Sequence, residues 1–200
     1  PDIQLLYDSF DLSIADQTVS VWSRPIACLI PRDSTAVSLS DAAYTGMGGW
    51  SPEFNFLWRL TNADLVACGF DMKVVAKYKS EPIHHDDKGL HINILEFIAL
   101  IINLWMSIYF IRKQSDKPGG HVLLLEADNT SALSWLRHAA RCHSLPVRNL
   151  AFFAHALFIF SGVFDYTQLN SSHIAGKSNV EADACSRPEL FPSLDSAIKH

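Results

Sequence analysis

Apolar positions change their spacing along the chain, and this change predicts where strands give way to helices. Residues 36–60 alternate apolar and polar positions around closely spaced glycines, which is typical of short strands joined by tight turns. Later apolar runs are longer and are followed by basic residues, proline or glycine, which end helices. The expected elements, in chain order, are three strands within 36–60, a helix at 92–112, a strand at 121–127, helices at about 130–138 and 147–162, a strand at 163–174 and a helix at 178–187.

This order of elements predicts an α/β fold. A meander of three strands is expected to be antiparallel, whereas the two later strands, each separated from its neighbour by a helix, are expected to be parallel. The result is a five-stranded mixed sheet with helices on both faces. The last helix has a capping-box spacing, with Ser178 as the N-cap and Glu181 three residues later.

The most apolar run, residues 94–111, raises the question of a membrane span. It contains Glu96, Asn103 and Ser107, and a carboxylate near the middle of a span is costly in lipid. A buried core helix is therefore the preferred prediction, with an interaction helix as the other soluble alternative. With 48% hydrophobic and 18% charged residues, the chain has enough apolar side chains for a sizeable core.

The cysteine spacing and the net charge limit the cellular locations and the binding partners that we expect. The four cysteines form no C-x-x-C pair, and the first residues carry acids where a secretory signal needs bases. We therefore expect an intracellular protein, in the cytoplasm or the nucleus, without a membrane partner. The net charge of −5 argues against a free-standing nucleic-acid binder, which usually has a basic excess.

Four acidic residues occupy unusual places in this layout. Asp41 lies in or at the end of the first strand and Asp128 directly follows the 121–127 strand, where it could also cap the next helix. Glu96 interrupts an apolar helix, and a buried charge of this kind needs a partner. Asp183 lies in the last helix, where a solvated position is the simple alternative.

The acids become more informative when they are considered together. If the first strand and the 121–127 strand are parallel neighbours, Asp41 and Asp128 meet where α/β sheets bind ligands. Helices on the two faces can bring Glu96 and Asp183 to the same point. Clustered carboxylates repel each other unless cations neutralise them, and hard oxygen ligands favour Mg²⁺ or Mn²⁺.

Four motifs stand out around these acids: SLSDAAYTGMGGW (38–50), HINILEFIAL (91–100), LEADNTSAL (125–133) and HIAGKSNVEADACSR (173–187), of which the last is the most specific. Together they resemble the ribonuclease H domain that follows the reverse transcriptase of retroelements. Their style is most similar to DIRS-like retrotransposons.

The resemblance implies an RNase H-like fold and a two-metal ribonuclease H that cuts the RNA strand of RNA–DNA hybrids. It implies Asp41, Glu96, Asp128 and Asp183 as ligands of two Mg²⁺ ions, with Mn²⁺ as a substitute. His173 would be the catalytic-loop histidine that assists proton transfer and product release, although a lone histidine at a strand end is often structural. Two weaker substrate contacts are expected, namely Ser40 and Asn129. The implied partner is a reverse transcriptase domain in the same polyprotein, in a retrotransposon or in a host-domesticated derivative.

The resemblance also divides the chain. It covers residues 35–190, with an N-terminal extension or linker over 1–34 and a tail over 191–200. Because 55 residues separate Asp41 from Glu96, more than the family's usual gap, an insertion is expected at about 61–90. Within it, the HHDD cluster at 84–87 is interpreted as a solvated loop, since adjacent residues are poorly placed around one tetrahedral zinc ion.

Other nucleases fit less well, and a non-catalytic module remains as the alternative. A proofreading-type exonuclease needs an acid two residues after the first Asp, where Ala43 stands, and an integrase needs Glu in place of Asp183. An inactive RNase H-like scaffold or connection module usually lacks one or more of the acids. All four are present in this sequence, which favours the enzyme.

Overall fold

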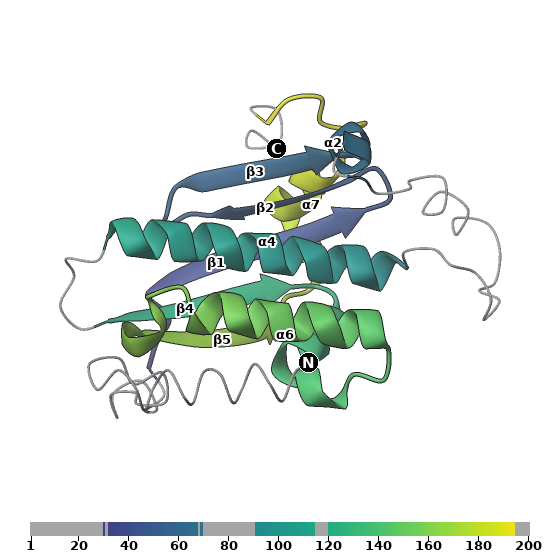
Figure 1. Cartoon of the computed structure of the whole chain (residues 1–200). Coiled ribbons are helices and arrows are strands. Elements are labelled where there is room, and N and C mark those ends of the chain that lie inside the picture. Colours follow the sequence, from purple (N-terminus) through teal and green to yellow (C-terminus); the bar gives the residue numbers. More distant parts are fainter. Residues whose placement is uncertain (1–29, 31, 68, 70–90, 115–119, 195–200) are drawn as a thin grey trace.

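The computed structural model describes residues 30, 32–67, 69, 91–114 and 120–194 (Figure 1). The strands are β1 (Ala36–Ala43), β2 (Gly46–Ser51), β3 (Phe56–Thr61), β4 (His121–Ala127) and β5 (Thr167–His173). The helices are α2 (Asn62–Ala67), α4 (Ile92–Lys113), α5 (Thr130–Arg137), α6 (Leu145–Ile159) and α7 (Val180–Ser186), with single 3₁₀ turns at Ala139–Arg141, Phe164–Tyr166 and Gly176–Ser178.

The five strands form one mixed sheet in the order β3-β2-β1-β4-β5. Strand β1 pairs antiparallel with β2, and β2 pairs antiparallel with β3. On its other side β1 pairs parallel with β4, which in turn pairs parallel with β5. The predicted α/β fold class is therefore confirmed: a five-stranded mixed sheet in which an antiparallel meander continues into parallel strands.

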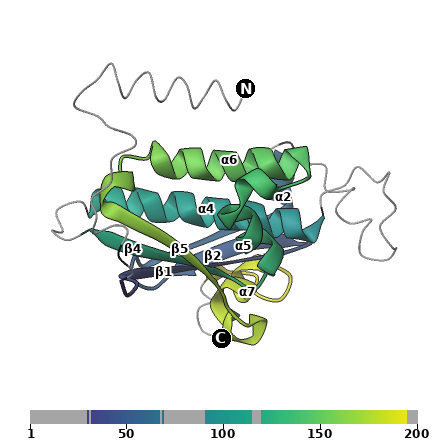
Figure 2. The ribbon, with the colours of Figure 1, turned by 90° about the horizontal axis from the view of Figure 1, so that it is seen from below.

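Helices cover both faces of this sheet, as predicted. Helices α4 and α6 lie side by side on one face, and the short α7 lies on the other (Figures 1 and 2). The main core lies between the sheet and α4, where Phe97, Leu100 and Leu104 are completely buried with Leu123 and Leu125 of β4. This core fixes α4 along the centre of the sheet, with its first turns beside the carboxyl ends of β1 and β4.

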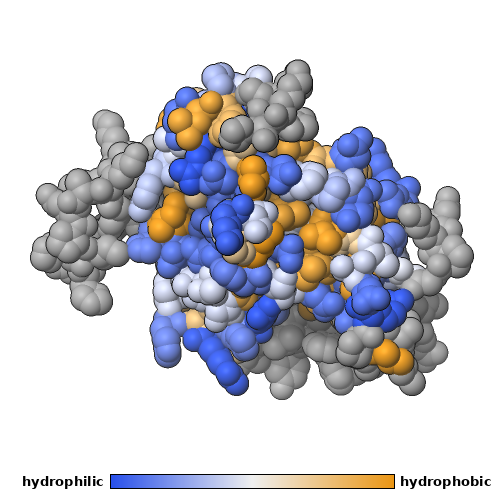
Figure 3. All heavy atoms as spheres, turned by 180° about the vertical axis from the view of Figure 1, so that it is seen from behind, coloured by the Kyte–Doolittle hydropathy of each residue, from blue (hydrophilic) through white to orange (hydrophobic). Residues whose placement is uncertain are grey.

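Helix α4 is long and apolar enough to cross a membrane by length and composition, but 61% of its most apolar 18-residue window is buried inside the structure. That burial agrees with the predicted core helix. Its outward side is also apolar: Trp105 is 56% exposed and, together with Phe153 and Leu157 of α6, lines a shallow groove between the two helices. The opposite side of the molecule mixes polar residues with small apolar patches (Figure 3).

Several helix boundaries differ from those predicted. Asn129, not Asp128, caps α5, because its side chain accepts a hydrogen bond from the Ala132 backbone N–H at 3.0 Å. Ser178 does not cap α7: it lies in a 3₁₀ turn, and α7 begins after Asn179. Another 3₁₀ turn occupies the start of the expected 163–174 strand, so β5 begins only at Thr167.

The predicted division of the chain falls largely outside the described residues. Of the expected insertion at 61–90, the structure describes the end of β3, helix α2 and Gly69, and the HHDD cluster at 84–87 is not described. The extension at 1–34 and the tail at 191–200 are described only at their inner ends. These divisions stay predictions.

Candidate active site

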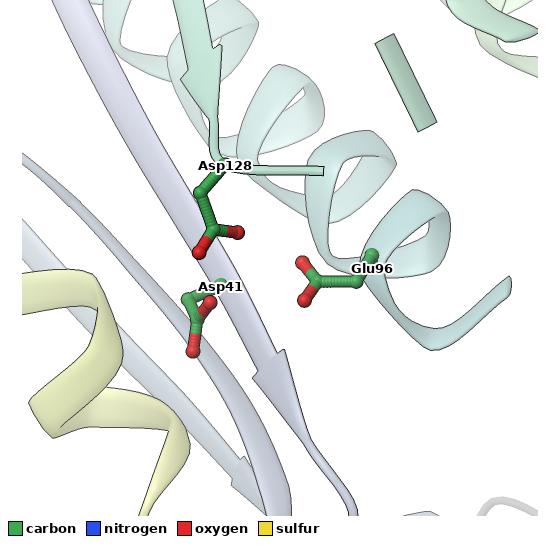
Figure 4. Close-up of side chains that lie close together, drawn as sticks. All are labelled: Asp41, Glu96 and Asp128. Atoms are coloured by element: carbon green, nitrogen blue, oxygen red, sulfur yellow. The ribbon is translucent and has the colours of Figure 1, made fainter. Parts of the chain in front are cut away.

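Three of the predicted acids meet at one end of the sheet. Asp41 lies near the end of β1, Asp128 directly follows β4, and Glu96 projects from the first turns of α4 (Figure 4). Each offers a carboxylate oxygen, and these oxygens all lie within 4.8 Å of one another. The parallel pairing of β1 with β4 accounts for the meeting, because both strands end at the same edge.

Burial makes this cluster electrostatically expensive. Asp41 is 4% exposed and Glu96 is 6% exposed. Burial, followed by repulsion from Asp41 and Asp128, raises the pKa of Glu96 to about 9. Burial also raises the pKa of Asp41 to about 6, and repulsion from Asp128 adds to this, although a hydrogen bond from Ser186 opposes it. When no cation is nearby, Glu96 would therefore keep its proton at neutral pH, whereas Asp41 would keep its proton only in mildly acidic solution.

The donor set fits a divalent cation. Oxygen Oε2 of Glu96 is buried and has no hydrogen-bond partner among the described residues. When all three acids are ionised, as they would be as metal ligands, they only accept hydrogen bonds and cannot satisfy one another. Hard oxygen ligands of this kind suit Mg²⁺ or Mn²⁺, which would neutralise the repulsion and occupy the free oxygen. The fit rests on Asp41, Glu96 and Asp128.

Asp183 stands apart from the other three acids. It lies on α7, on the opposite face of the sheet from α4, and does not belong to the group within 4.8 Å. Its Oδ1 accepts hydrogen bonds from Arg187, at 2.7 Å from Nε and 2.5 Å from Nη2. The two side chains are 40% and 42% exposed. Asp183 is thus near enough to repel Asp41, but its carboxylate is already paired with a cation.

His173 lies at the rim of the site. It is exposed at the end of β5, and its Nε2 is 3.1 Å from the backbone oxygen of Asp128. The parallel pairing of β4 with β5, in which Ala127 faces His173, sets this position. The histidine therefore borders the acids without joining them, which keeps its ring accessible to solvent.

The two weaker candidates have structural contacts instead. Ser40 is completely buried, so its side chain has no surface to offer a substrate, and its backbone oxygen accepts a hydrogen bond from Asn179. The expected contact from Ser40 stays a prediction. Asn129 caps α5 with its oxygen, and its Nδ2 donates to Asn93 at 3.0 Å. Its role as a substrate contact stays a prediction.

Sequence reasoning missed the residues that surround the acids. Ser186 donates a hydrogen bond to Asp41, and Gly176 lies so close to Asp128 that an added Cβ would be 2.8 Å from its Oδ2. Both residues belong to the closing motif at 173–187, and this motif could have pointed to them. Only the fold shows which acid each one contacts.

Comparisons with known proteins gave structural neighbours only. No protein-family model matches the chain, and no curated protein matches it. Among solved structures, RNase H1 from the halophilic archaeon Halobacterium salinarum is similar at 14% identity with a TM-score of 0.46, covering 79% of this chain and 98% of that one. The N-terminal RNase H domain of a Mycobacterium tuberculosis protein, solved as a fusion with maltose-binding protein, is similar at 12% identity with a TM-score of 0.39, covering 82% and 98%.

Proposed function

We propose that this chain is a metal-dependent endonuclease that hydrolyses the RNA strand of RNA–DNA hybrids. The observation that carries the proposal is the convergence of Asp41, Glu96 and Asp128 at the carboxyl ends of two parallel strands, with one buried carboxylate oxygen unpaired. Placing two buried acids beside a third, half-buried one opposes folding unless a cation compensates, so the arrangement is best explained by cation binding. The motifs that resemble retroelement ribonuclease H supply the substrate class.

The acids would hold Mg²⁺, two ions in the family's arrangement, with Mn²⁺ as a substitute. Such ions polarise a phosphate oxygen and lower the pKa of a bound water. Asp41 and Glu96 contribute buried oxygens, whereas Asp128 is half-buried at the strand end and more open to solvent. Asp183 would complete the set once its carboxylate leaves Arg187.

His173 is suited to moving a proton at the rim. If Nε2 donates its proton to the backbone oxygen of Asp128, Nδ1 is left as an acceptor on an exposed ring. That nitrogen can take a proton near the acids and release it to solvent. The expected role in proton transfer and product release is therefore compatible with its position.

The charge of the chain bears on its partners. With a net charge of −5, the chain offers little general attraction to the phosphates of a nucleic acid. We therefore infer that a reverse transcriptase domain in the same polyprotein contributes much of the binding affinity for the nucleic acid. This polyprotein would belong to a retrotransposon or to a domesticated derivative. An intracellular location follows from this setting.

A catalytically inactive RNase H-like scaffold is the second candidate. The unpaired oxygen of Glu96 and the raised pKa values of Glu96 and Asp41 argue against it. A scaffold gains nothing from buried acids that repel one another, and neutral replacements there would stabilise it.

The decisive experiment is cleavage of a labelled RNA–DNA hybrid with Mg²⁺, comparing the wild type with Asp128→Asn and using a DNA duplex of the same sequence as control. We expect cleavage of the RNA strand by the wild type and loss of cleavage in the variant. An inactive wild type at every metal concentration would overturn the enzyme proposal, and an active variant would overturn the site.

A further inference from the structure

The hydroxyl of Ser186, at the end of α7, lies between two hydrogen-bond acceptors, one on a side chain and one on the backbone. Its Oγ is 2.5 Å from Oδ2 of Asp41 and 2.9 Å from the backbone oxygen of Asp183, and the residue is completely buried. A hydroxyl has one proton to donate. The shorter contact goes to a carboxylate, and hydrogen bonds to charged acceptors are the stronger kind. The proton of Ser186 therefore belongs mainly to Asp41.

We propose that Ser186 is a positioning residue that fixes the carboxylate of Asp41 for metal binding. This proposal rests on the proposed function. By occupying Oδ2, the hydroxyl stops rotation of the carboxylate and leaves the second oxygen for the cation. Groups that hold metal ligands in this way commonly change metal affinity by about 10- to 100-fold when they are removed.

A neutral donor suits this position better than a cation. Ser186 adds no charge of its own, so Asp41 keeps the full negative charge that a divalent ion needs. Arg187, the next residue, instead pairs with Asp183 through its guanidinium. Ser186 thus orients the carboxylate of Asp41 without adding charge, whereas Arg187 neutralises the carboxylate of Asp183.

The position of Ser186 is itself fixed from outside α7. A helix of seven residues is not stable alone and depends on packing. Arg59 of β3 donates hydrogen bonds to the backbone oxygens of Ala184 at 2.9 Å and Cys185 at 2.7 Å, and it also bonds Phe191. Gly48 of β2 lets the helix lie flush on the sheet, because an added Cβ would be 2.3 Å from Cβ of Cys185. These contacts hold Ser186 over Asp41.

The competing explanation is local. A serine near a helix end often bonds the carbonyl three or four residues earlier, and the contact with the Asp183 oxygen is of this kind. In that case the hydroxyl would contribute to folding only. Loss of it would then lower stability without changing how tightly the folded protein binds a metal.

The test is Mn²⁺ affinity of the folded chain, measured by electron paramagnetic resonance for wild type, Ser186→Ala and Ser186→Thr. We expect the association constant to fall about tenfold in Ser186→Ala and to recover in Ser186→Thr, which keeps the hydroxyl. The matched control is Ser107→Ala: Ser107 is equally buried and hydrogen-bonded, but its partners are Ser38 and the Asn103 backbone. Its Mn²⁺ affinity should equal that of the wild type.

Two outcomes separate the proposals. If the wild type binds Mn²⁺ and cleaves a hybrid but Ser186→Ala binds Mn²⁺ equally well, the positioning role is overturned and the proposed function stands. If the wild type neither binds Mn²⁺ nor cleaves, the proposed function itself fails. Should Ser186→Ala not fold, the nearly isosteric Ser186→Cys decides, because its thiol is a weak donor and should show the same loss of affinity.

Discussion

Two polar clusters are buried beneath the same helix, and they differ in chemistry. At the start of α4, Glu96 meets Asp41 and Asp128, and all three are acids. Seven and eleven residues further along, Asn103 and Ser107 enter the same interface, where Asn103 accepts from Trp58 at 3.0 Å and Ser107 lies 2.7 Å from the Ser38 hydroxyl.

The second cluster is neutral and contains both donors and acceptors, which pair with one another except for Nδ2 of Asn103. The first consists of three acids and leaves Oε2 of Glu96 unpaired, and when these acids are ionised they offer acceptors alone. Burial by itself therefore does not mark a functional site. The gathering of acids does, because it identifies a place where a cation would relieve the repulsion.

Replacing Glu96 with Gln should have the largest effect. Glu96→Gln keeps the shape of the side chain but removes a metal ligand, and we expect hybrid cleavage to fall by at least about 100-fold. The metal-free variant should nevertheless be more stable than the wild type at pH 8, by on the order of 2 kcal/mol or more, because Glu96 must take up a proton when the wild type folds at this pH, whereas Gln is neutral in both states. Cleavage assays and urea unfolding test the two parts. A less stable, fully active variant would contradict both.

The opposite result is expected at the neutral cluster. Asn103→Ala leaves the buried Trp58 Nε1 without its acceptor and opens a small cavity, so the free energy of unfolding should fall by about 2 kcal/mol. Urea unfolding measures this loss. Mn²⁺ affinity of the folded variant should equal that of the wild type, and a tenfold change would show that the two clusters are not independent.

The pH dependence of stability should distinguish the clusters as well. The folded pKa values of Asp41 and Glu96, about 6 and about 9, lie above their ordinary values of 3.8 and 4.5. Between about pH 4 and pH 9 the folded metal-free protein therefore binds more protons than the unfolded chain. Its free energy of unfolding should decrease as the pH rises through this range.

Thermal unfolding in a chelator across this pH range tests the expectation, and Glu96→Gln isolates the contribution of that residue. The melting temperature of the wild type should fall relative to that of the variant as pH rises. Saturating Mn²⁺ should remove most of the difference between low and high pH in the wild type. Parallel pH curves for wild type and variant in the chelator would contradict the assigned burial of Glu96.

The smallest effect is expected at Asp183. Its pairing with Arg187 is about 40% exposed on both sides, so Arg187→Gln should change the free energy of unfolding by less than about 1 kcal/mol. Urea unfolding at low and high salt measures this, and the small loss should shrink further as salt screens the pair. A loss as large as that of Asn103→Ala would mean that Asp183 belongs with the buried groups.

The sequence predicted the meeting of Asp41 with Asp128 because strand order and direction follow from the alternation of strands with helices. It also predicted Glu96, since a carboxylate in an apolar helix needs a partner. The burial of Ser40 was equally predictable: neighbours on a strand face opposite sides, and each side of the central β1 carries a helix.

Other features could not be predicted because the sequence offers more than one partner for the same group, or because the partners are far apart along the chain. Asp128 and Asn129 are adjacent and both can cap a helix, and only the backbone path selects Asn129. Asp183 had two possible partners, the other acids' cation or Arg187 four residues later, and the structure pairs it with Arg187. The contact of Ser186 with Asp41 joins residues 145 positions apart and depends on how α7 lies on the sheet.

The seven-residue length of α7 has a consequence for how the protein would lose function on warming. Partial opening of a structure costs least where few residues are buried together, and α7 offers only Ala182, Ala184, Cys185 and Ser186 to the interior. Its amides should exchange with deuterated solvent sooner than those of α4. Heat inactivation would then begin as a local detachment of this helix, while the sheet that carries Asp41 is still folded.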